Sequence, residues 1–241
     1  MIAVVVLKRR EELRERVLRA VRTLQPEKTV VVLVGGASTK GLTDEYVVES
    51  DRDFNANVNA ALDFIEPWQP KWIYLCPEDE WFEPGAREEL EQIFNAPQDV
   101  WYVRVLTFWD ERHVNVNFPV PRAEAYVWRF RPGLRLHPLV ETTCPFALVR
   151  SGAVGVMRHR HLDFGYSTEE YRSWAIKEAS LRGYLNPVHN VLVQPPRLIP
   201  YDKLDPLYPR IVLPHPGVIY PYEPLPSGTV QGGLRRPDRA D

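Results

Sequence analysis

The chain has 241 residues, of which 44% are hydrophobic and 26% charged, and its 30 Lys and Arg nearly balance its 32 Asp and Glu. These values are typical of a folded globular protein with a substantial core, and they exclude wholesale disorder and a dedicated nucleic-acid binder, which needs concentrated positive charge. No apolar run approaches the roughly 18 residues of a membrane span, and the apolar stretch 1–7 is too short for a signal peptide, so we expect a cytoplasmic protein without a membrane span. The two cysteines exclude a disulfide framework and a Cys-rich zinc site.

The first hundred residues alternate between short apolar runs and helical patterns. We expect strands at 2–7, 29–34 and 72–76, and helices at 11–24, 55–64 and 84–94. In the first helix, apolar residues recur at spacings of three and four and so share one face. Strand, helix and strand within about 35 residues form a βαβ unit, which predicts parallel pairing and a right-handed crossover.

The second half of the chain is more antiparallel in pattern and ends in a proline-rich region. We expect strands at 100–108, 114–118, 126–130 and 146–149, and a helix at 168–182 that Ser167 caps, with Glu170 completing a capping box. Many of the 23 prolines follow residue 186, and they rule out long helices and central strands there. The expected organisation is therefore one domain, 1–187, with halves 1–99 and 100–187, and an extension, 188–241, whose end is disordered.

Three acids follow the strand expected at 72–76. Glu78, Asp79 and Glu80 would lie at its carboxyl end, where open α/β sheets bind their ligands. Clustered carboxylates repel one another unless a cation or a positive group offsets them, and a divalent ion bridging to a substrate phosphate would do so. The alternative is a solvated loop before the helix that begins at Pro84, because acids near helix N-termini are common for dipole reasons alone.

In order and spacing, three segments resemble the nucleotide-sugar glycosyltransferases of family 2. Residues 72–84 are similar to the family's strand and Asp-x-Asp motif, with Asp79 at the second Asp; residues 34–41 are similar to its Ser-containing turn, and residues 57–62 to its Asn-containing helix. The resemblance implies the A-type glycosyltransferase fold, a mixed, mostly parallel α/β sheet flanked by helices. It divides the domain into a nucleotide-sugar-binding half and an acceptor half.

The same resemblance implies a function. It is metal-assisted transfer of a sugar from a nucleotide-diphosphate sugar to a hydroxyl of a carbohydrate, lipid or protein acceptor. Mg²⁺ or Mn²⁺ would be held by Asp79 with Glu80, and Glu78 would support the donor.

The chain departs from the family pattern at several positions. Pro77 replaces the first Asp of the motif and Gly35 the acid that contacts the nucleoside, while Ser38 and Asn59 are retained and become candidates for donor binding. The departures leave two alternatives open. One is a degenerate member that binds without turnover, and the other is a nucleotidyltransferase-like enzyme, which also needs carboxylates at strand ends.

The second half carries two further likenesses. The segment 129–131, followed by Val140 and Glu141, is similar to segments of family members in which this Glu is the catalytic base, although an exposed loop Glu is the simpler interpretation. Residues 158–161 resemble a family strand that ends in His. His159 and His161 would share one face of that strand near the metal, with Arg158 near the diphosphate, and the alternative is a polar edge strand.

Overall fold

The structure, a computed structural model, describes residues 1–8, 10–50, 53–117, 123–137, 143–145, 147–148, 153–181, 191–192 and 194–209. Its strands are β1 (Ile2–Leu7), β2 (Lys28–Val34), β3 (Tyr46–Ser50), β4 (Trp72–Pro77), β5 (Glu80–Phe82), β6 (Val100–Thr107), β7 (His113–Asn115), β8 (Ala123–Arg129), β9 (Val154–Val156), β10 (His161–Asp163) and β11 (Leu198–Pro200). Its helices are α1 (Glu11–Thr23), α2 (Phe54–Ile65), α3 (Ala86–Ile93) and α5 (Glu169–Leu181), with short 3-10 turns η1 (Glu66–Trp68) and η2 (Tyr201–Lys203).

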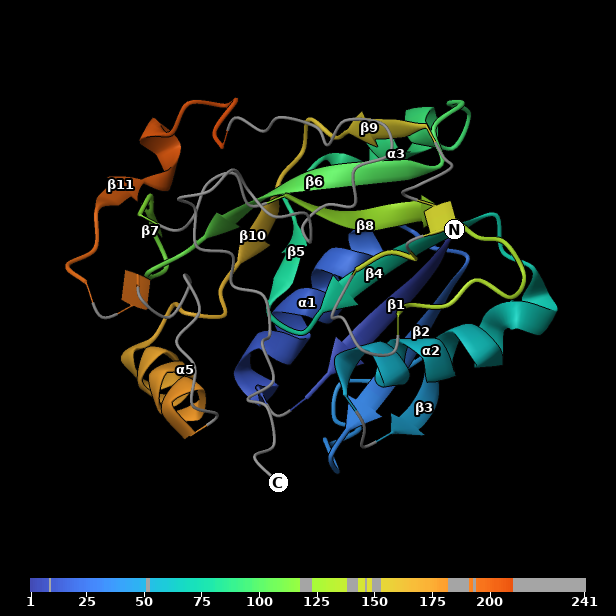
Figure 1. Cartoon of the computed structure of the whole chain (residues 1–241), viewed down its shortest axis with the longest axis horizontal. Coiled ribbons are helices and arrows are strands. Elements are labelled where there is room, and N and C mark those ends of the chain that lie inside the picture. The colour runs from blue at the N-terminus through green and yellow to red at the C-terminus, as the bar shows by residue number, and fades with distance from the viewer. Residues whose placement is uncertain are drawn as a thin grey trace, which may run out of the picture.

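Within the described residues, nine strands form one sheet in the order β3-β2-β1-β4-β8-β6-β10-β5, with β9 beside β6 (Figure 1). The pairs from β3 through β2 and β1 to β4 are all parallel. Every residue of β1 is buried, as expected for a central parallel strand covered on both faces, and this explains its uninterrupted apolar sequence. The strands β1, β2 and β4 therefore end at the same edge of the sheet.

Strand β8 joins the two halves of the sheet. It runs antiparallel to β4 on one side and to β6 on the other. Strands from before and after residue 100 therefore belong to one continuous hydrogen-bonded sheet. Beyond β6, β10 is parallel to β6, and β5 returns antiparallel to β10. The prediction of a mixed, mostly parallel α/β sheet flanked by helices is confirmed.

The helices bury the faces that their spacing predicts. In α1, Leu13, Val17 and Val21 are buried. Helix α2 packs on β1, β2 and β3, and the Asp53 side chain caps it by accepting a hydrogen bond from the backbone N–H of Ala56 at 2.8 Å.

The segment from residue 194 to residue 209 packs on the rest of the molecule. Strand β11 pairs antiparallel with β7, and the hydroxyl of Tyr201 in η2 donates to Glu83 Oε1 at 2.5 Å. The Arg160 guanidinium holds the same Glu83 and also donates to the carbonyl of Asp205. Part of the expected proline-rich extension thus lies against the sheet.

Several local expectations are corrected by the structure. The described residues 147 and 148 are helical, so the strand expected at 146–149 is wrong. Thr168, not Ser167, caps α5, because its hydroxyl accepts from the backbone N–H of Tyr171 at 3.3 Å, while the Ser167 hydroxyl donates to the Phe164 carbonyl. The strand expected at 158–161 begins only at His161.

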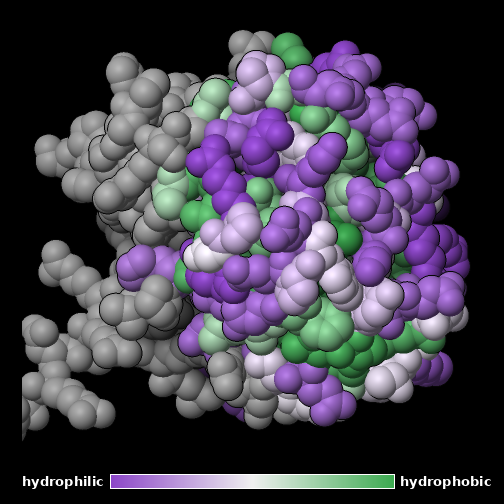
Figure 2. Space-filling model, turned by 90° about the vertical axis from the view of Figure 1, so that its right-hand side faces the viewer, coloured by the Kyte–Doolittle hydropathy of each residue, from purple (hydrophilic) through white to green (hydrophobic). Residues whose placement is uncertain are grey.

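Polar residues cover most of the face that Figure 2 shows, and hydrophobic residues gather in one patch low on it. Tyr46 in β3 and Phe64 in α2 are among the large hydrophobic side chains that remain exposed. Among the described helices, none combines the length and apolar character that crossing a membrane requires.

Candidate functional site

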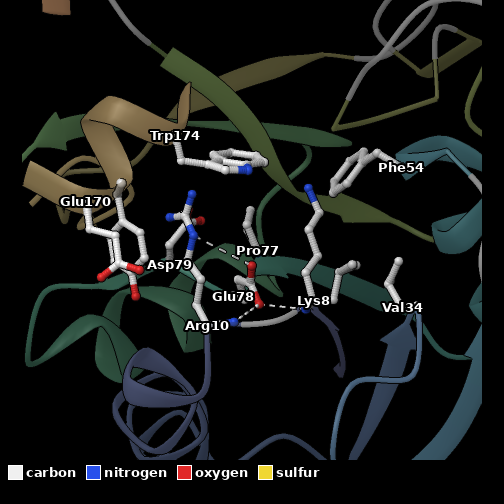
Figure 3. Close-up of a pocket in the computed structure, with 12 residues that line it drawn as sticks. Lys8, Arg10, Val34, Phe54, Pro77, Glu78, Asp79, Glu170 and Trp174 are labelled. Carbon is white, nitrogen blue, oxygen red and sulfur yellow. Dashed lines mark hydrogen bonds and ion pairs between the residues drawn. The ribbon is translucent and has the colours of Figure 1, made fainter. Parts of the chain in front are cut away.

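A cavity of about 450 Å³ opens at the carboxyl ends of β1, β2 and β4, where α5 covers one side (Figure 3). This position follows from the topology, because the loops after neighbouring parallel strands diverge and leave a crevice. The residues that line it are Val6, Lys8, Arg10, Val34, Gly35, Phe54, Pro77, Glu78, Asp79, Glu170, Tyr171 and Trp174.

Glu78 fastens the turn between β1 and α1 to the end of β4. Its Oε2 accepts hydrogen bonds from the backbone N–H groups of Lys8 at 2.6 Å and Arg10 at 3.4 Å. Burial raises the pKa of Glu78 from its ordinary value, and the neighbouring Asp79 raises it further. The carboxylate that the sequence assigned to donor support therefore positions the two basic residues of this turn.

Asp79 is paired with Arg10. The guanidinium Nη1 lies 2.5 Å from Asp79 Oδ2 and 3.1 Å from the carbonyl oxygen of Gly165, and the guanidinium carbon lies 4.5 Å from the centre of the Tyr171 ring. Burial raises the pKa of Asp79 to about 6 against the opposing effect of Arg10, and the nearby Asp163 and Glu80 add to the rise.

Lys8 directs its ammonium group into the cavity, between the rings of Trp174 and Phe54 (Figure 3). The ammonium makes no ion pair with any residue in the described part of the chain. Trp174 is 55% exposed although it is a large aromatic side chain, so much of its ring faces solvent beside the cavity. The cavity thus offers, between two aromatic surfaces, a cation that has no ion-pair partner among the described residues.

The carboxylates of Asp79, Glu80 and Asp163 place oxygen atoms within 4.8 Å of one another. Glu80 and Asp163 are 4% and 2% exposed. Glu80 Oε2 accepts a hydrogen bond from the hydroxyl of Tyr126 at 2.6 Å. Asp163 accepts from the backbone N–H of Gly165 at 2.7 Å and from the Thr107 hydroxyl at 3.2 Å.

By ligand type and spacing these three carboxylates could hold a divalent ion, since Mg²⁺ and Mn²⁺ prefer oxygen ligands. The fit to an ion that bridges to a ligand in the cavity is poor. Glu80 and Asp163 do not line the cavity. A Cβ added at Gly165 would lie 2.7 Å from Asp79 Oδ2 and 2.9 Å from Asp163 Oδ1, so the Gly165 backbone already packs against both acids.

The two histidines lie in different surroundings. His161 is fully buried, with its Nε2 3.0 Å from the Tyr74 hydroxyl and its Nδ1 3.4 Å from Glu80 Oε2. His159 instead pairs with Glu89 of α3, at 2.7 Å from Nδ1 to Oε2. The two side chains therefore do not share a face, and neither lines the cavity.

Three other predicted site residues have hydrogen-bond or ion-pair partners within the protein and lie outside the cavity lining. Arg158 forms an ion pair with Glu89 at 3.5 Å, on α3. Asn59 exchanges two hydrogen bonds with the backbone of Leu136, and Ser38 Oγ accepts from the backbone N–H of Lys40. None of the three is in the cavity lining. Glu141, the predicted base, lies outside the described residues.

Sequence reasoning missed Lys8, Arg10 and Trp174 in the cavity and Asp163 beside it. A signal for the first two was present, because Lys8 and Arg10 directly follow a buried strand that precedes a helix, and loops at that edge bind ligands. Trp174 carried no such signal, since large aromatic residues are more often part of the core.

No protein-family model matches the chain. No curated protein matches it either. Among solved structures, it is similar to an inositol-1-phosphate CTP transferase from T. maritima, with 14% identity and a TM-score of 0.44, over 76% of this chain and 97% of that one.

Two further solved structures are similar at the same level. A manganese complex of a protein from Mycobacterium tuberculosis has 16% identity and a TM-score of 0.45, over 72% of this chain and 96% of that one. TarS from S. aureus has 9% identity and a TM-score of 0.44, over 73% of this chain and 39% of that one. At such identities the likeness says nothing about what this chain binds.

Proposed function

We propose that the cavity binds the phosphate groups of a nucleotide-linked sugar and that the chain transfers the sugar to an acceptor hydroxyl. The observation that carries this proposal is the Lys8 ammonium between Trp174 and Phe54, at the carboxyl ends of three parallel strands, where no described residue forms an ion pair with it. A phosphate group would be an anionic partner for the Lys8 ammonium, and the flanking rings would stack on a base or a sugar. The sequence resemblance to family 2 glycosyltransferases supports the same class of ligand.

In the proposed reaction, the oxygen of an acceptor hydroxyl forms a bond to the anomeric carbon of the sugar. The bond from that carbon to the diphosphate oxygen breaks, and the nucleoside diphosphate leaves with the electron pair. Lys8 would stabilise the charge that develops on this leaving group. The hydroxyl proton passes to a base, for which the resemblance names Glu141.

The proposal includes a divalent metal ion but does not specify which one. The resemblance implies Mg²⁺ or Mn²⁺, which when bound would offset the charge of the diphosphate. Asp79, Glu80 and Asp163 are the described residues that could hold such an ion, but Arg10 already pairs with Asp79. The positioning of Lys8 and Arg10 by Glu78 and Asp79 does not depend on it.

Nucleotidyl transfer is the second candidate. The observation that favours it is the run of basic residues from Lys8 to Arg10 at the end of β1, because a nucleoside triphosphate carries more negative charge than a nucleotide sugar. In that reaction a sugar phosphate oxygen would attack the α-phosphorus, and pyrophosphate would leave. The two candidates share the cavity but differ in their products.

Calorimetric titration with nucleotide sugars and with nucleoside triphosphates, followed by product analysis, tests this proposal. Lys8→Met should weaken binding by about 10–150-fold, since a hydrogen bond to a charged group contributes about 1.5–3 kcal/mol. Lys71→Met is the matched control, because Lys71 is exposed and precedes β4 at the opposite edge of the sheet. Binding without any product would support a module that does not turn over, and equal binding by both variants would contradict the proposed site.

A further inference from the structure

The acid at the end of β4 already has a counter-charge, supplied by the protein. Arg10 Nη1 donates to Asp79 Oδ2 at 2.5 Å, and Arg10 Nε lies 3.9 Å from Glu78 Oε1. The Arg10 side chain is 16% exposed, so this pair is largely shielded from water. Screening by solvent is therefore weaker than for an exposed pair, and the hydrogen bond is charge-assisted.

Three separate parts of the fold fix the position of this guanidinium. It extends from the turn between β1 and α1, pairs with the acids after β4, and donates to the Gly165 carbonyl in the turn between β10 and α5. The Tyr171 ring of α5 covers it at 4.5 Å. A planar guanidinium suits both the carboxylate and the ring, which an ammonium group would not match.

A divalent ion and Arg10 are alternatives at Asp79. An ion bound to Oδ2 would stand about 2.0–2.6 Å from that oxygen, and Nη1 lies at 2.5 Å from the same atom. Glu80 and Asp163 already accept hydrogen bonds from the protein, Glu80 from Tyr126, and Asp163 from Thr107 and the Gly165 backbone. An ion held by these carboxylates would lie close to the Arg10 guanidinium, and the two positive charges would repel each other.

Arg10 also retains a donor for a ligand. Its Nη2 makes no hydrogen bond with the described residues, while Nη1 is shared by Asp79 and Gly165. Lys8, two residues earlier on the same turn, contributes its unpaired ammonium to the same cavity. Two cationic groups on one turn therefore face the space where a phosphate group would bind.

We infer that Arg10 is the resident cation of this site, in the place where the family resemblance puts a divalent ion, so that Arg10 and Lys8 bind the ligand's phosphate group without a metal. This inference rests on the proposed function, because it assumes a phosphate-bearing ligand in the cavity. Arg10 acts here as a phosphate-binding and specificity-determining residue, and the acids Glu78 and Asp79 position it.

The first test uses the wild-type chain alone. Titration with Mn²⁺, followed by the electron paramagnetic resonance signal of the free ion, should show no stoichiometric site. One bound ion per chain that is lost in Asp79→Asn would overturn the inference. This measurement needs no ligand and no variant of Arg10, so it holds even where an Arg10 variant fails to fold.

The second test measures binding of inorganic pyrophosphate by calorimetry in the presence of a chelator. Wild-type protein should bind it, Arg10→Gln should bind at least about tenfold more weakly, as expected for loss of one charged hydrogen bond, and Arg10→Lys should be intermediate. Arg19→Gln is the control, since Arg19 is exposed on α1 and forms an ion pair with Glu15 on the same helix. Circular dichroism would establish that each variant is folded.

The outcomes separate this inference from the function on which it rests. Pyrophosphate binding that requires Mn²⁺ would overturn the role of Arg10 and leave the proposed transferase site standing. Equal binding by wild type and Arg10→Gln in chelator would also overturn it. No binding under either condition would contradict both the inference and the proposed phosphate site.

Discussion

The sequence predicts where the Asp79 side chain lies, but it does not predict which residue pairs with it. Its position at the carboxyl end of a buried strand was readable from the apolar run 72–76 and the acids that follow. Its partner Arg10 lies 69 residues earlier, and nothing local in the sequence relates the two. The sequence analysis expected either a cation or a positive group to offset the acids, and the structure places the guanidinium of Arg10 beside this carboxylate.

The raised pKa of Asp79, about 6 against an ordinary value of 3.8, predicts a pH dependence of stability. Between these values the folded state holds a proton that the unfolded state releases, so the free energy of unfolding falls as pH rises from about 4 to about 6. Asp79→Asn lacks this titration. The unfolding free energy of wild type minus that of Asp79→Asn should therefore decrease over this range, by on the order of 2–3 kcal/mol. Urea denaturation at several pH values measures it, and a difference that stays constant or rises would contradict the pKa shift.

His161 was predicted to lie near a metal ion, but in the structure it is a buried residue of an aromatic cluster. Its ring stacks on Tyr126 at 4.4 Å and lies edge-on to Phe82 at 4.5 Å, which makes it part of an aromatic cluster inside the sheet. The pattern of alternating Arg and His at 158–161 could not reveal this, because the strand begins only at His161. A buried imidazole with polar partners on both nitrogens specifies the packing of β10 against β4 and β5.

At the level of elements, long periodic segments were predicted well and short ones were not. The strands β1, β2 and β4 and the helices α1 and α2 agree with expectation within one residue at each end. Strand β5 was missed because Glu80, a charged residue, opens a segment of only three residues. Its burial depends on pairing with β10, some 80 residues later, which no local pattern encodes.

Helix α5 contributes Glu170, Tyr171 and Trp174 to the cavity. Because Trp174 is largely exposed, Trp174→Ala should leave the melting temperature nearly unchanged. The same change should weaken binding of a nucleotide sugar by about 5–150-fold, since stacking of a base on an aromatic ring contributes about 1–3 kcal/mol. Leu207→Ala, at another exposed apolar residue, is the control. Unchanged affinity in Trp174→Ala would remove this ring from the proposed site.

At the level of the whole molecule, residues 194–209 connect parts of the fold that are distant in sequence. Arg104 of β6 donates to the carbonyl of Pro206, and Arg160 donates to the carbonyls of Asp205 and Tyr208. The high proline content of this region correctly argued against long helices and central strands. It could not show that the segment is fastened to the sheet, because those contacts involve arginines far away in the chain.

Removing the hydrogen bond from Tyr201 to Glu83 tests whether the contacts of residues 194–209 stabilise the fold. Burial raises the pKa of Tyr201 to about 12, and Glu83 adds to the rise, so the hydroxyl remains a donor across the usual pH range. Tyr201→Phe should lower the free energy of unfolding by about 1–3 kcal/mol, because a partly buried carboxylate loses a donor. Tyr46→Phe, at an exposed tyrosine in β3, is the control for loss of a hydroxyl group. Equal urea midpoints for both variants would contradict a stabilising role of the segment.

The unequal exposure of the tryptophans has a practical consequence. The chain has seven, and Trp72, Trp81 and Trp128 are buried, whereas the indole of Trp174 faces solvent beside the cavity. Emission from a solvated indole lies at longer wavelength than emission from a buried one, so Trp174 contributes to the long-wavelength part of the emission, together with the half-buried Trp68, Trp101 and Trp109. A stacked ligand would quench this long-wavelength emission. Fluorescence of the unlabelled protein would therefore report ligand binding at the proposed site.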